Sequence, residues 1–251
     1  MIITSKDNNR IKEIKKLKQK KYRTDKYIVE GTKMIMEAIT ENLDIDVIVI
    51  RSGFNLEIDI SEYNKIETTE AIFNELTDVV SPQGILAVIK KKKSKNQIEK
   101  DDNYIIALDG IQDPGNLGTI IRTADAANLK QIIVSKDTVD GYSPKVIRST
   151  MGAIYRVKLI EADNLSEYLN DLKKYGFEIV TTELNASKSI YDVDYNKKIV
   201  VIGNEANGIS REIQKIANHK VKIPMPGKAE SLNASVASSI MIYEYVRQHL
   251  N

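Results

Sequence analysis

From Tyr104 onward the sequence alternates short apolar runs with segments of helical length. In Ile199-Val200-Val201-Ile202 every side chain is apolar, so both faces of that strand must be covered. Strands of this kind, separated by helices, predict an α/β fold with a parallel sheet that carries helices on both faces. The runs expected to form strands are 104–108, 131–135, 155–160, 177–182, 198–203 and 220–223.

The intervening helices are expected at 117–127, 143–153 and 165–175. The final segment, 234–250, places Val236, Ile240, Tyr243 and Leu250 along one helical face. The pattern alone leaves open what covers that face.

The first 90 residues also alternate helix and strand patterns. Asn8 or Asn9 can cap a helix that carries Ile11, Ile14 and Leu17, and strands are expected at 27–31, 47–50 and 84–89. Short helices are expected between these strands, one after residue 31 and one at 71–76. This pattern predicts a small α/β domain.

A charged run with almost no apolar residue lies between the two patterns, at 90–103. Such a run buries too little surface to offset the entropy lost on ordering, so we interpret it as a linker. The predicted organisation is therefore a domain over residues 1–90, a linker over 91–102 and a second domain over 103–251.

Composition excludes several classes of protein. The chain has no cysteine, and its only histidines are His219 and His249. Disulfides, thiolate metal sites and cysteine nucleophiles are thereby excluded, and a histidine-based metal cluster is disfavoured. No run of about 18 apolar residues indicates a membrane span, and the N-terminal residues do not have the pattern of a signal peptide. We therefore expect a cytoplasmic protein without a metal.

Positive charge is concentrated locally, although the net charge of the chain is only +2. Between Lys6 and Lys26 there are ten Lys or Arg residues and three acidic ones, and a second cluster is formed by 90–93 and Lys95. Such clusters suggest an anionic partner, since each phosphate contact releases counterions. The alternative for each cluster is a solvated helix face or a flexible linker.

Three loops of the second domain carry polar residues at the positions where α/β sheets bind ligands, after the carboxyl ends of strands. The first follows Asp109, and Asn116 or a neighbour opens the next helix, so that Arg122 could point toward the same region as Asn116. The second contains Gly203 and Glu205, where glycine allows the backbone to approach a ligand. Each of these two segments could equally be an ordinary turn leading into a helix.

The third loop leads into the final helix and contains Pro224, Pro226 and Gly227. Ser231, Asn233 and Ser235 follow it, and helix capping accounts for only one of these three residues. A helix N-terminus also exposes backbone N–H groups that can hold an oxygen of a ligand.

Together the three segments resemble the signature motifs of the SpoU/TrmH family of RNA ribose methyltransferases, within the SPOUT class. They are Asn116–Arg122 (NLGTIIR), Ile202–Gly208 (IGNEANG) and Ile223–Ser235 (IPMPGKAESLNAS), and the resemblance covers residues 104–251. The N-terminal part is similar to the substrate-binding domain often fused to this catalytic domain. The RNA-binding residues that this similarity suggests are Arg10, Lys12, Lys16, Arg23 and Glu30.

The resemblance implies a trefoil knot in the C-terminal domain, a homodimer with the final helix in its interface, and S-adenosyl-L-methionine as cofactor. Backbone groups of Gly203, Ile223 and Leu232 would hold the cofactor, and Thr182, Glu183 and Leu184 would line its approach.

The catalytic residue implied by the resemblance is Arg122. Because a guanidinium stays protonated in proteins, we interpret it as a fixed cation that binds phosphate and stabilises developing negative charge on the ribose oxygen. Asn116, Glu205, Ser231 and Asn233 would position the ribose and Arg122, with Ser231 or Glu205 as possible proton relays.

The expected activity is methyl transfer to a ribose 2′-hydroxyl of RNA. The fused N-terminal domain favours ribosomal RNA, of the large subunit, over transfer RNA. A non-catalytic RNA-binding protein is an alternative, but it leaves Arg122 and the third motif without a purpose. A nucleotide hydrolase would need a phosphate loop or a carboxylate–metal cluster, and the sequence contains neither.

Overall fold

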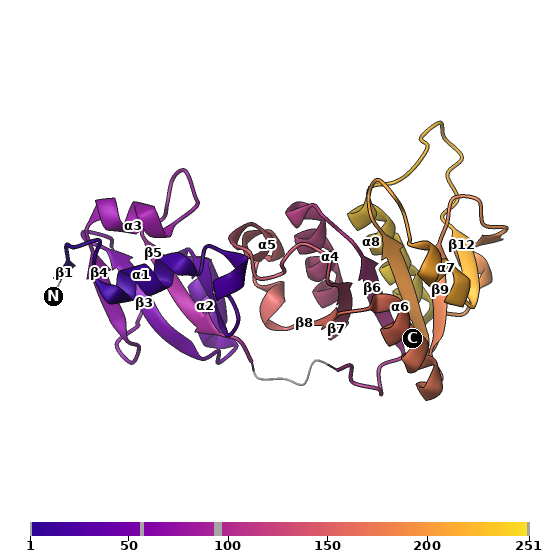
Figure 1. Ribbon diagram of the computed structural model, residues 1–251, viewed down its shortest axis with the longest axis horizontal. Helices are drawn as coiled ribbons and strands as arrows, with labels where there is room; N and C mark the ends of the chain where they lie inside the picture. The colour runs from indigo at the N-terminus through magenta and orange to yellow at the C-terminus, as the bar shows by residue number, and fades with distance from the viewer. Residues whose placement is uncertain (1, 56–57, 93–96, 250–251) are drawn as a thin grey trace. The chain divides into compact units, whose positions relative to one another are not determined.

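The computed structural model describes residues 2–55, 58–92 and 97–249. The described residues form two compact units, one from 1–94 together with 142–155, the other from 95–141 together with 156–251 (Figure 1). Residues 93–96 of the predicted linker lie outside the described residues. No sequence pattern separated 142–155 from the rest of the second domain.

The first unit contains a five-stranded mixed sheet with helices α1 (Asn9–Lys16), α2 (Thr32–Thr40) and α3 (Glu70–Leu76). Three strands match those expected from the sequence, whereas β1 and β4 were not predicted. In spatial order the strands are β1 (Ile2–Ile3), β4 (Lys65–Thr68), β3 (Ile45–Arg51), β5 (Ile85–Lys90) and β2 (Lys26–Glu30). The predicted small α/β fold is therefore confirmed.

Helix α1 begins as predicted, because the Asn8 side chain accepts a hydrogen bond from the backbone N–H of Arg10 at 3.0 Å. Its apolar face, with Ile11 and Ile14, is buried against the sheet and α3. A short 3₁₀ helix, η1 (Lys20–Tyr22), follows it.

The segment 142–155 contains α5 (Pro144–Thr150) and the 3₁₀ helix η2 (Ala153–Tyr155). The Tyr155 hydroxyl donates to the carbonyl oxygen of Met34 at 3.2 Å, and the rings of Tyr142 and Tyr27 lie 4.9 Å apart. These contacts explain why the strand expected at 155–160 begins only at Lys158, which corrects the prediction.

The second unit contains a seven-stranded sheet in which every pair is parallel, as the doubly apolar strands predicted. Its two-residue edge strand β10 was not predicted. In spatial order the strands are β10 (Lys188–Ser189), β12 (His219–Lys222), β9 (Glu178–Thr182), β11 (Lys198–Gly203), β6 (Tyr104–Asp109), β7 (Gln131–Ser135) and β8 (Lys158–Ala162).

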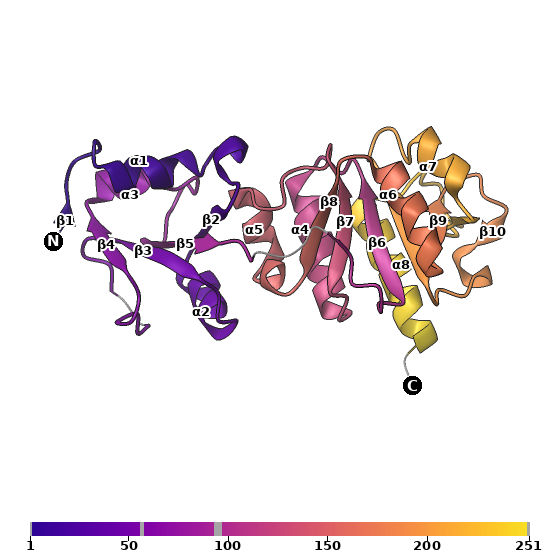
Figure 2. The same ribbon diagram turned by 60° about the horizontal axis from the view of Figure 1, so that its bottom comes forward.

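Helices cover both faces of this sheet (Figure 2). On one face α6 (Leu165–Leu172) and α7 (Arg211–Ile216) pack over alternate strand residues such as Ile133 and Val201. On the other face α4 (Pro114–Ala126) packs beside α8 (Ala234–His249). Short 3₁₀ helices η3 (Lys173–Tyr175) and η4 (Ile190–Asp192) complete the unit.

The order of the strands reverses between β6 and β11. From β6 the chain builds outward through β7 and β8, whereas β9, β11 and β12 lie on the other side of β6. The two central strands end level with each other, since Asp109 pairs with Gly203. The loops that follow them therefore start side by side at a topological switch point, where α/β sheets bind ligands. The trefoil knot stays a prediction from the resemblance.

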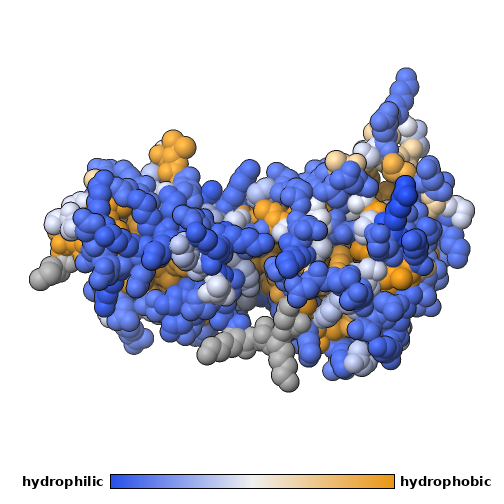
Figure 3. All heavy atoms as spheres, viewed as in Figure 1, coloured by the Kyte–Doolittle hydropathy of each residue, from blue (hydrophilic) through white to orange (hydrophobic). Residues whose placement is uncertain are grey.

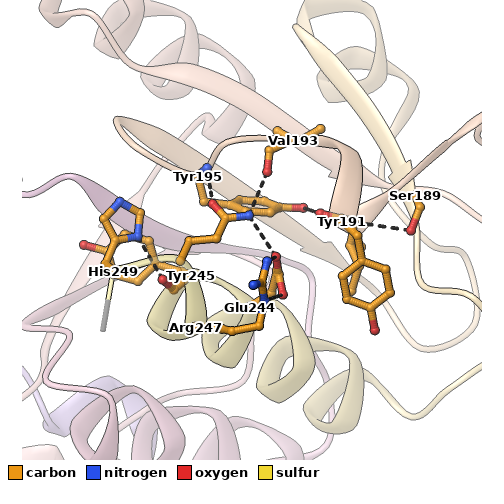
Figure 4. Close-up of polar contacts among 10 residues, drawn as sticks. Ser189, Tyr191, Val193, Tyr195, Glu244, Tyr245, Arg247 and His249 are labelled. Carbon is orange, nitrogen blue, oxygen red and sulfur yellow. Dashed lines mark hydrogen bonds and ion pairs between the residues drawn. The ribbon is translucent and has the colours of Figure 1, made fainter. Parts of the chain in front are cut away.

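The C-terminal half of α8 is held by the buried carboxylate of Glu244 (Figure 4). This carboxylate accepts hydrogen bonds from Arg247 and Gln248, each at 2.8 Å. Gln248 also donates to the carbonyl oxygen of Val193 at 2.9 Å and accepts from the backbone N–H of Tyr195 at 2.9 Å. The helix is thus tied to the loop that follows η4. No helix in the described ranges is long and apolar enough to cross a membrane.

Candidate functional site

Asp113 is the N-cap of α4 and therefore ends the loop after β6. Its carboxylate accepts a hydrogen bond from the backbone N–H of Asn116 at 2.8 Å, and Pro114 occupies the first turn. Asp113, rather than Asn116, is therefore the residue that opens this helix. The side chain of Asn116 is left free to make other contacts.

The structure brings all three predicted segments together at Asn116. Its Nδ2 donates to Oε1 of Glu205 at 2.8 Å, and its Oδ1 accepts from Nδ2 of Asn233 at 3.0 Å. Glu205 follows β11 and Asn233 precedes α8, so residues about 90 and 117 positions away converge on one buried amide. We call this chain of hydrogen bonds the Asn116–Glu205–Asn233 cluster.

Glu205 is held as a carboxylate. Partial burial would raise its pKa, but hydrogen bonds from Asn116 and from the backbone N–H groups of Gln112, at 3.3 Å, and Asp113, at 3.4 Å, outweigh that effect and lower the pKa. An ionised carboxylate only accepts hydrogen bonds. In this geometry Glu205 is therefore an acceptor that orients neighbouring donors.

The loop that carries Glu205 is closed by backbone hydrogen bonds between Asn204 and Gly208, at 3.0 and 2.9 Å. A side chain on Gly203 would collide with the backbone of Gly208 and Ile209, so only glycine fits there. Asn204 ties this loop to the first one by donating to the carbonyl oxygen of Gly110 at 2.7 Å. The sequence-based reason for Gly203, approach of the backbone to a ligand, therefore accounts for only part of its role.

Asn233 also caps α8, since its Oδ1 accepts from the backbone N–H of Ser235 at 2.9 Å. The buried Ser235 hydroxyl donates to the same oxygen at 2.6 Å. Ser231 is exposed, lies at the neighbouring cavity and has no hydrogen bond to the cluster in the described part of the chain.

A cavity of about 320 Å³ opens beside the cluster, between the ends of β9, β11 and β12. It is lined by all six residues predicted to hold the cofactor or to line its approach, and also by Glu205 and Ser231. The predicted six are Thr182, Glu183, Leu184, Gly203, Ile223 and Leu232. Further lining residues, among them Asn204, Met225, Glu230 and Ala237, were not singled out from the sequence.

Arg122 is not part of the cluster. It lies on the exposed side of α4 and makes no hydrogen bond or ion pair with any residue that the structure describes. Its guanidinium is therefore available to a ligand.

The residues predicted to contact RNA in the first unit differ in their surroundings. Arg10, Lys12 and Lys16 are exposed on α1. Arg23 is only 6% exposed and donates to the carbonyl oxygen of Leu17 at 2.7 Å. Its guanidinium is therefore bound to the end of α1. Glu30 accepts from the Thr77 hydroxyl at 2.5 Å, and burial raises the pKa of its carboxyl group.

The cavity fits the cofactor that the sequence suggests. Its volume lies within the range of about 300–1,000 Å³ typical of cofactor sites. Leu184, Ile223 and Leu232 supply apolar surface for an adenine ring, and Leu184 is unusually exposed at 59%. Carboxylates of Glu183 and Glu205 supply negative charge for a sulfonium group. No group of three or more potential metal ligands occurs among the residues that could be searched.

Comparisons with known proteins agree with this site. Residues 103–243 match the model of the SpoU rRNA Methylase family, and residues 8–87 match that of the MRM3-like substrate binding domain. The chain is 29% identical to the 23S rRNA (guanosine(2553)-2′-O)-methyltransferase RlmP of Bacillus subtilis, over 96% of this chain and 97% of that protein. It is 33% identical, over 88% of its length and 95% of the relative, to a Staphylococcus epidermidis protein assigned to the TrmH tRNA/rRNA methyltransferases.

Among solved structures, the AdoMet-bound rRNA methyltransferase from Sinorhizobium meliloti has a TM-score of 0.88 and 30% identity, and covers 100% of this chain and 99% of its own. The family model spans the cluster, the cavity and Arg122 alike. The chain therefore belongs to the SpoU rRNA Methylase family and is an S-adenosylmethionine-dependent RNA methyltransferase.

Proposed function

We propose that this protein methylates a ribose 2′-hydroxyl in ribosomal RNA of the large subunit. The observation that carries the proposal is the position of the Asn116–Glu205–Asn233 cluster at the rim of the cofactor cavity. The substrate is supported by the relative named for 23S rRNA and by the matched substrate-binding domain. Ribosomal RNA as substrate also favours a cytoplasmic location.

In this reaction the ribose oxygen forms a bond to the methyl carbon while the carbon–sulfur bond of the cofactor breaks, and the hydroxyl proton is lost. The cofactor supplies the reactive methyl group, so the residues of the chain have to position the oxygen and favour its nucleophilic form. Asn116 is held by hydrogen bonds to Glu205 and from Asn233, and the two amides can orient the ribose. Because Glu205 is ionised, its carboxylate can accept the hydroxyl proton, directly or through the Ser231 hydroxyl at the same cavity.

Arg122 is proposed to act as a fixed cation. A guanidinium does not deprotonate in proteins, so it cannot act as a general base. Its exposed side chain, without a partner in the described residues, can bind a phosphate next to the target ribose and stabilise negative charge on the attacking oxygen.

A homodimer through α8 is proposed as well. Val236 and Tyr243 are 46% and 51% exposed, and Ile240 lies between them on the same helical face. This apolar face is thus left largely uncovered by the part of the chain that the structure describes. Leu250, which was expected on the same face, lies outside the described residues.

Two measurements test the proposed function. Calorimetry with S-adenosylmethionine tests the cavity, and mapping of ribose methylation in RNA from a deletion strain identifies the substrate. Loss of one methylated ribose from 23S rRNA is the expected result. Loss from a transfer RNA instead would contradict the ribosomal substrate, and an unchanged pattern in all RNA would contradict the activity.

A further inference from the structure

Eight of the ten basic residues between Lys6 and Lys26 fall into two groups once the chain is folded. The other two are Arg10, which is exposed, and Arg23, which is buried. In the first group each lysine faces a carboxylate. Lys6 and Lys15 both contact Glu75 of α3, the second at 2.8 Å. The other pairs are Lys12 with Asp7 at 2.7 Å, Lys18 with Asp78 at 2.7 Å and Lys26 with Asp46 at 3.0 Å. Much of the positive charge counted in the sequence is therefore neutralised locally.

The second group comprises Lys16, Lys20 and Lys21. All three are exposed, and none has a carboxylate partner in the ranges that the structure describes. Lys20 and Lys21 directly precede Tyr22, which is 39% exposed. The Nζ atoms of Lys21 and Lys16 lie 4.9 and 5.7 Å from the centre of its ring. Two of the three lysines thus lie at one exposed aromatic side chain, on a surface that is hydrophilic over α1 (Figure 3).

The backbone that carries Tyr22 is fixed. Its N–H donates to the carbonyl oxygen of Gln19 at 3.1 Å, and the N–H of Arg23 donates to that of Lys20 at 3.0 Å. The buried guanidinium of Arg23 then ties the turn to the end of α1 through the carbonyl oxygen of Leu17. Arg23, which the sequence suggested as an RNA contact, instead helps to fix the backbone of the turn that carries Tyr22.

An exposed aromatic ring with free cations beside it is the arrangement by which proteins bind unpaired nucleotides, because every base can stack on the ring while the cations hold phosphates. The lysines can leave the ring for phosphate, since cation–π contacts at exposed positions are weak. We infer that Tyr22 stacks on an unpaired base of the RNA substrate, with Lys16, Lys20 and Lys21 holding the flanking phosphates. This inference rests on the proposed function and adds to it the mode of recognition.

Fluorescence provides a direct test, because the chain contains no tryptophan. Tyr22→Trp introduces a single indole at the proposed platform, and stacking on a base should quench its emission when 23S rRNA transcript is added. The matched control is Tyr175→Trp in the second unit. Tyr175 is 47% exposed and has the Nζ of Lys100 at 3.6 Å from its ring centre. Its emission should stay unchanged.

Binding measurements supply a second test. Tyr22→Ala should weaken binding to 23S rRNA about tenfold, whereas Tyr22→Phe keeps the ring and should restore it. Replacing Lys16, Lys20 and Lys21 by Gln should make the negative slope of log affinity against log salt shallower by about 2, since three phosphate contacts are lost. The same replacement at the paired Lys6, Lys12 and Lys15 should change the slope less.

The results of these experiments can contradict the stacking of Tyr22 without contradicting the proposed methyltransferase function. If wild-type protein binds 23S rRNA but the indole at position 22 is not quenched, the stacking platform is wrong and the methyltransferase proposal stands. If wild-type protein binds no RNA at all, both proposals fail.

Discussion

At the scale of single residues, different side chains of this site orient the substrate and stabilise charge. The amide of Asn116 is fixed from both sides by Glu205 and Asn233, so it can orient a substrate but cannot move far. Arg122, four residues from the end of the same helix, has no partner within the described residues. We therefore propose that the cluster orients the ribose and that Arg122 stabilises negative charge on the attacking oxygen.

Substitution of Arg122 tests whether this residue stabilises the transition state without contributing to cofactor binding. Arg122→Ala should lower the single-turnover methylation rate about 100- to 1,000-fold, because an electrostatic stabiliser of the transition state is lost. Cofactor affinity should stay nearly unchanged, since Arg122 does not line the cavity. Arg122→Lys should recover little activity if the planar, two-pronged donor geometry matters. A near-normal rate for Arg122→Ala at saturating RNA and cofactor would contradict the role.

The cofactor cavity is tested best at its exposed rim. Gly203→Val is a poor test, because its side chain would collide with the backbone of Gly208 and disturb the loop itself. Leu184→Glu places charge where an adenine ring is expected and leaves the core untouched, since Leu184 is 59% exposed. We expect at least tenfold weaker binding of S-adenosylmethionine by calorimetry, a loss of about 1.4 kcal/mol. Val80→Glu, at a fully exposed position in the first unit, is the control. Equal affinities of the two variants would place the cofactor elsewhere.

At the scale of elements, the sequence predicted strands better than contacts. The strands of the parallel sheet were predicted because residues such as Ile199 and Val200 are apolar on both faces, a local property of the chain. The loops after β6 and β11 were correctly predicted to lie together, because carboxyl ends of parallel strands share one edge of the sheet. The roles of Asp113 and Asn204 were missed, since each depends on hydrogen bonds in a loop that only the fold forms.

The sequence predicted the strands better than it predicted which basic side chains are paired with carboxylates. The basic cluster between Lys6 and Lys26 suggested an anionic partner from composition, yet Lys15 is paired with Glu75, which lies 60 residues further along the chain. Pairing at such separation depends on how α1 packs against α3 and cannot be read from local composition. Likewise, the buried position of Arg23 follows from the turn after α1, not from its residue type.

The hydrogen bonds of Glu244 in α8 predict how the stability of the folded protein depends on pH. Hydrogen bonding and attraction from Arg247 lower the pKa of Glu244 below its ordinary value. A carboxyl group with a depressed pKa in the folded state stabilises that state above its unfolded pKa, near 4.5, and this contribution is lost as pH falls through the folded value. Glu244→Gln should therefore lower the melting temperature at pH 7 and have a smaller effect near pH 3. The free energy lost at pH 7 should be about 1–3 kcal/mol. An equal loss at both pH values would contradict the assigned cause.

At the scale of the whole molecule, the exposed face of α8 predicts self-association. Tyr243→Glu places a charge on the apolar face formed with Val236 and Ile240. Light scattering coupled to gel filtration should find a dimer for the wild-type chain and a monomer for this variant. Met36→Glu, at a comparably exposed position on α2, should leave the mass unchanged. A wild-type monomer at micromolar concentration would exclude the dimer.

The central claim is that methyl groups pass from S-adenosylmethionine to a ribose oxygen of ribosomal RNA. Alkaline hydrolysis of RNA requires a free 2′-hydroxyl, so a 2′-O-methylated position resists cleavage. Purified protein, labelled S-adenosylmethionine and unmodified 23S rRNA should therefore yield label at one alkali-resistant linkage. Arg122→Ala should abolish this signal. Label in an alkali-sensitive nucleotide, which would indicate methylation of a base, or no label in 23S rRNA would contradict the account.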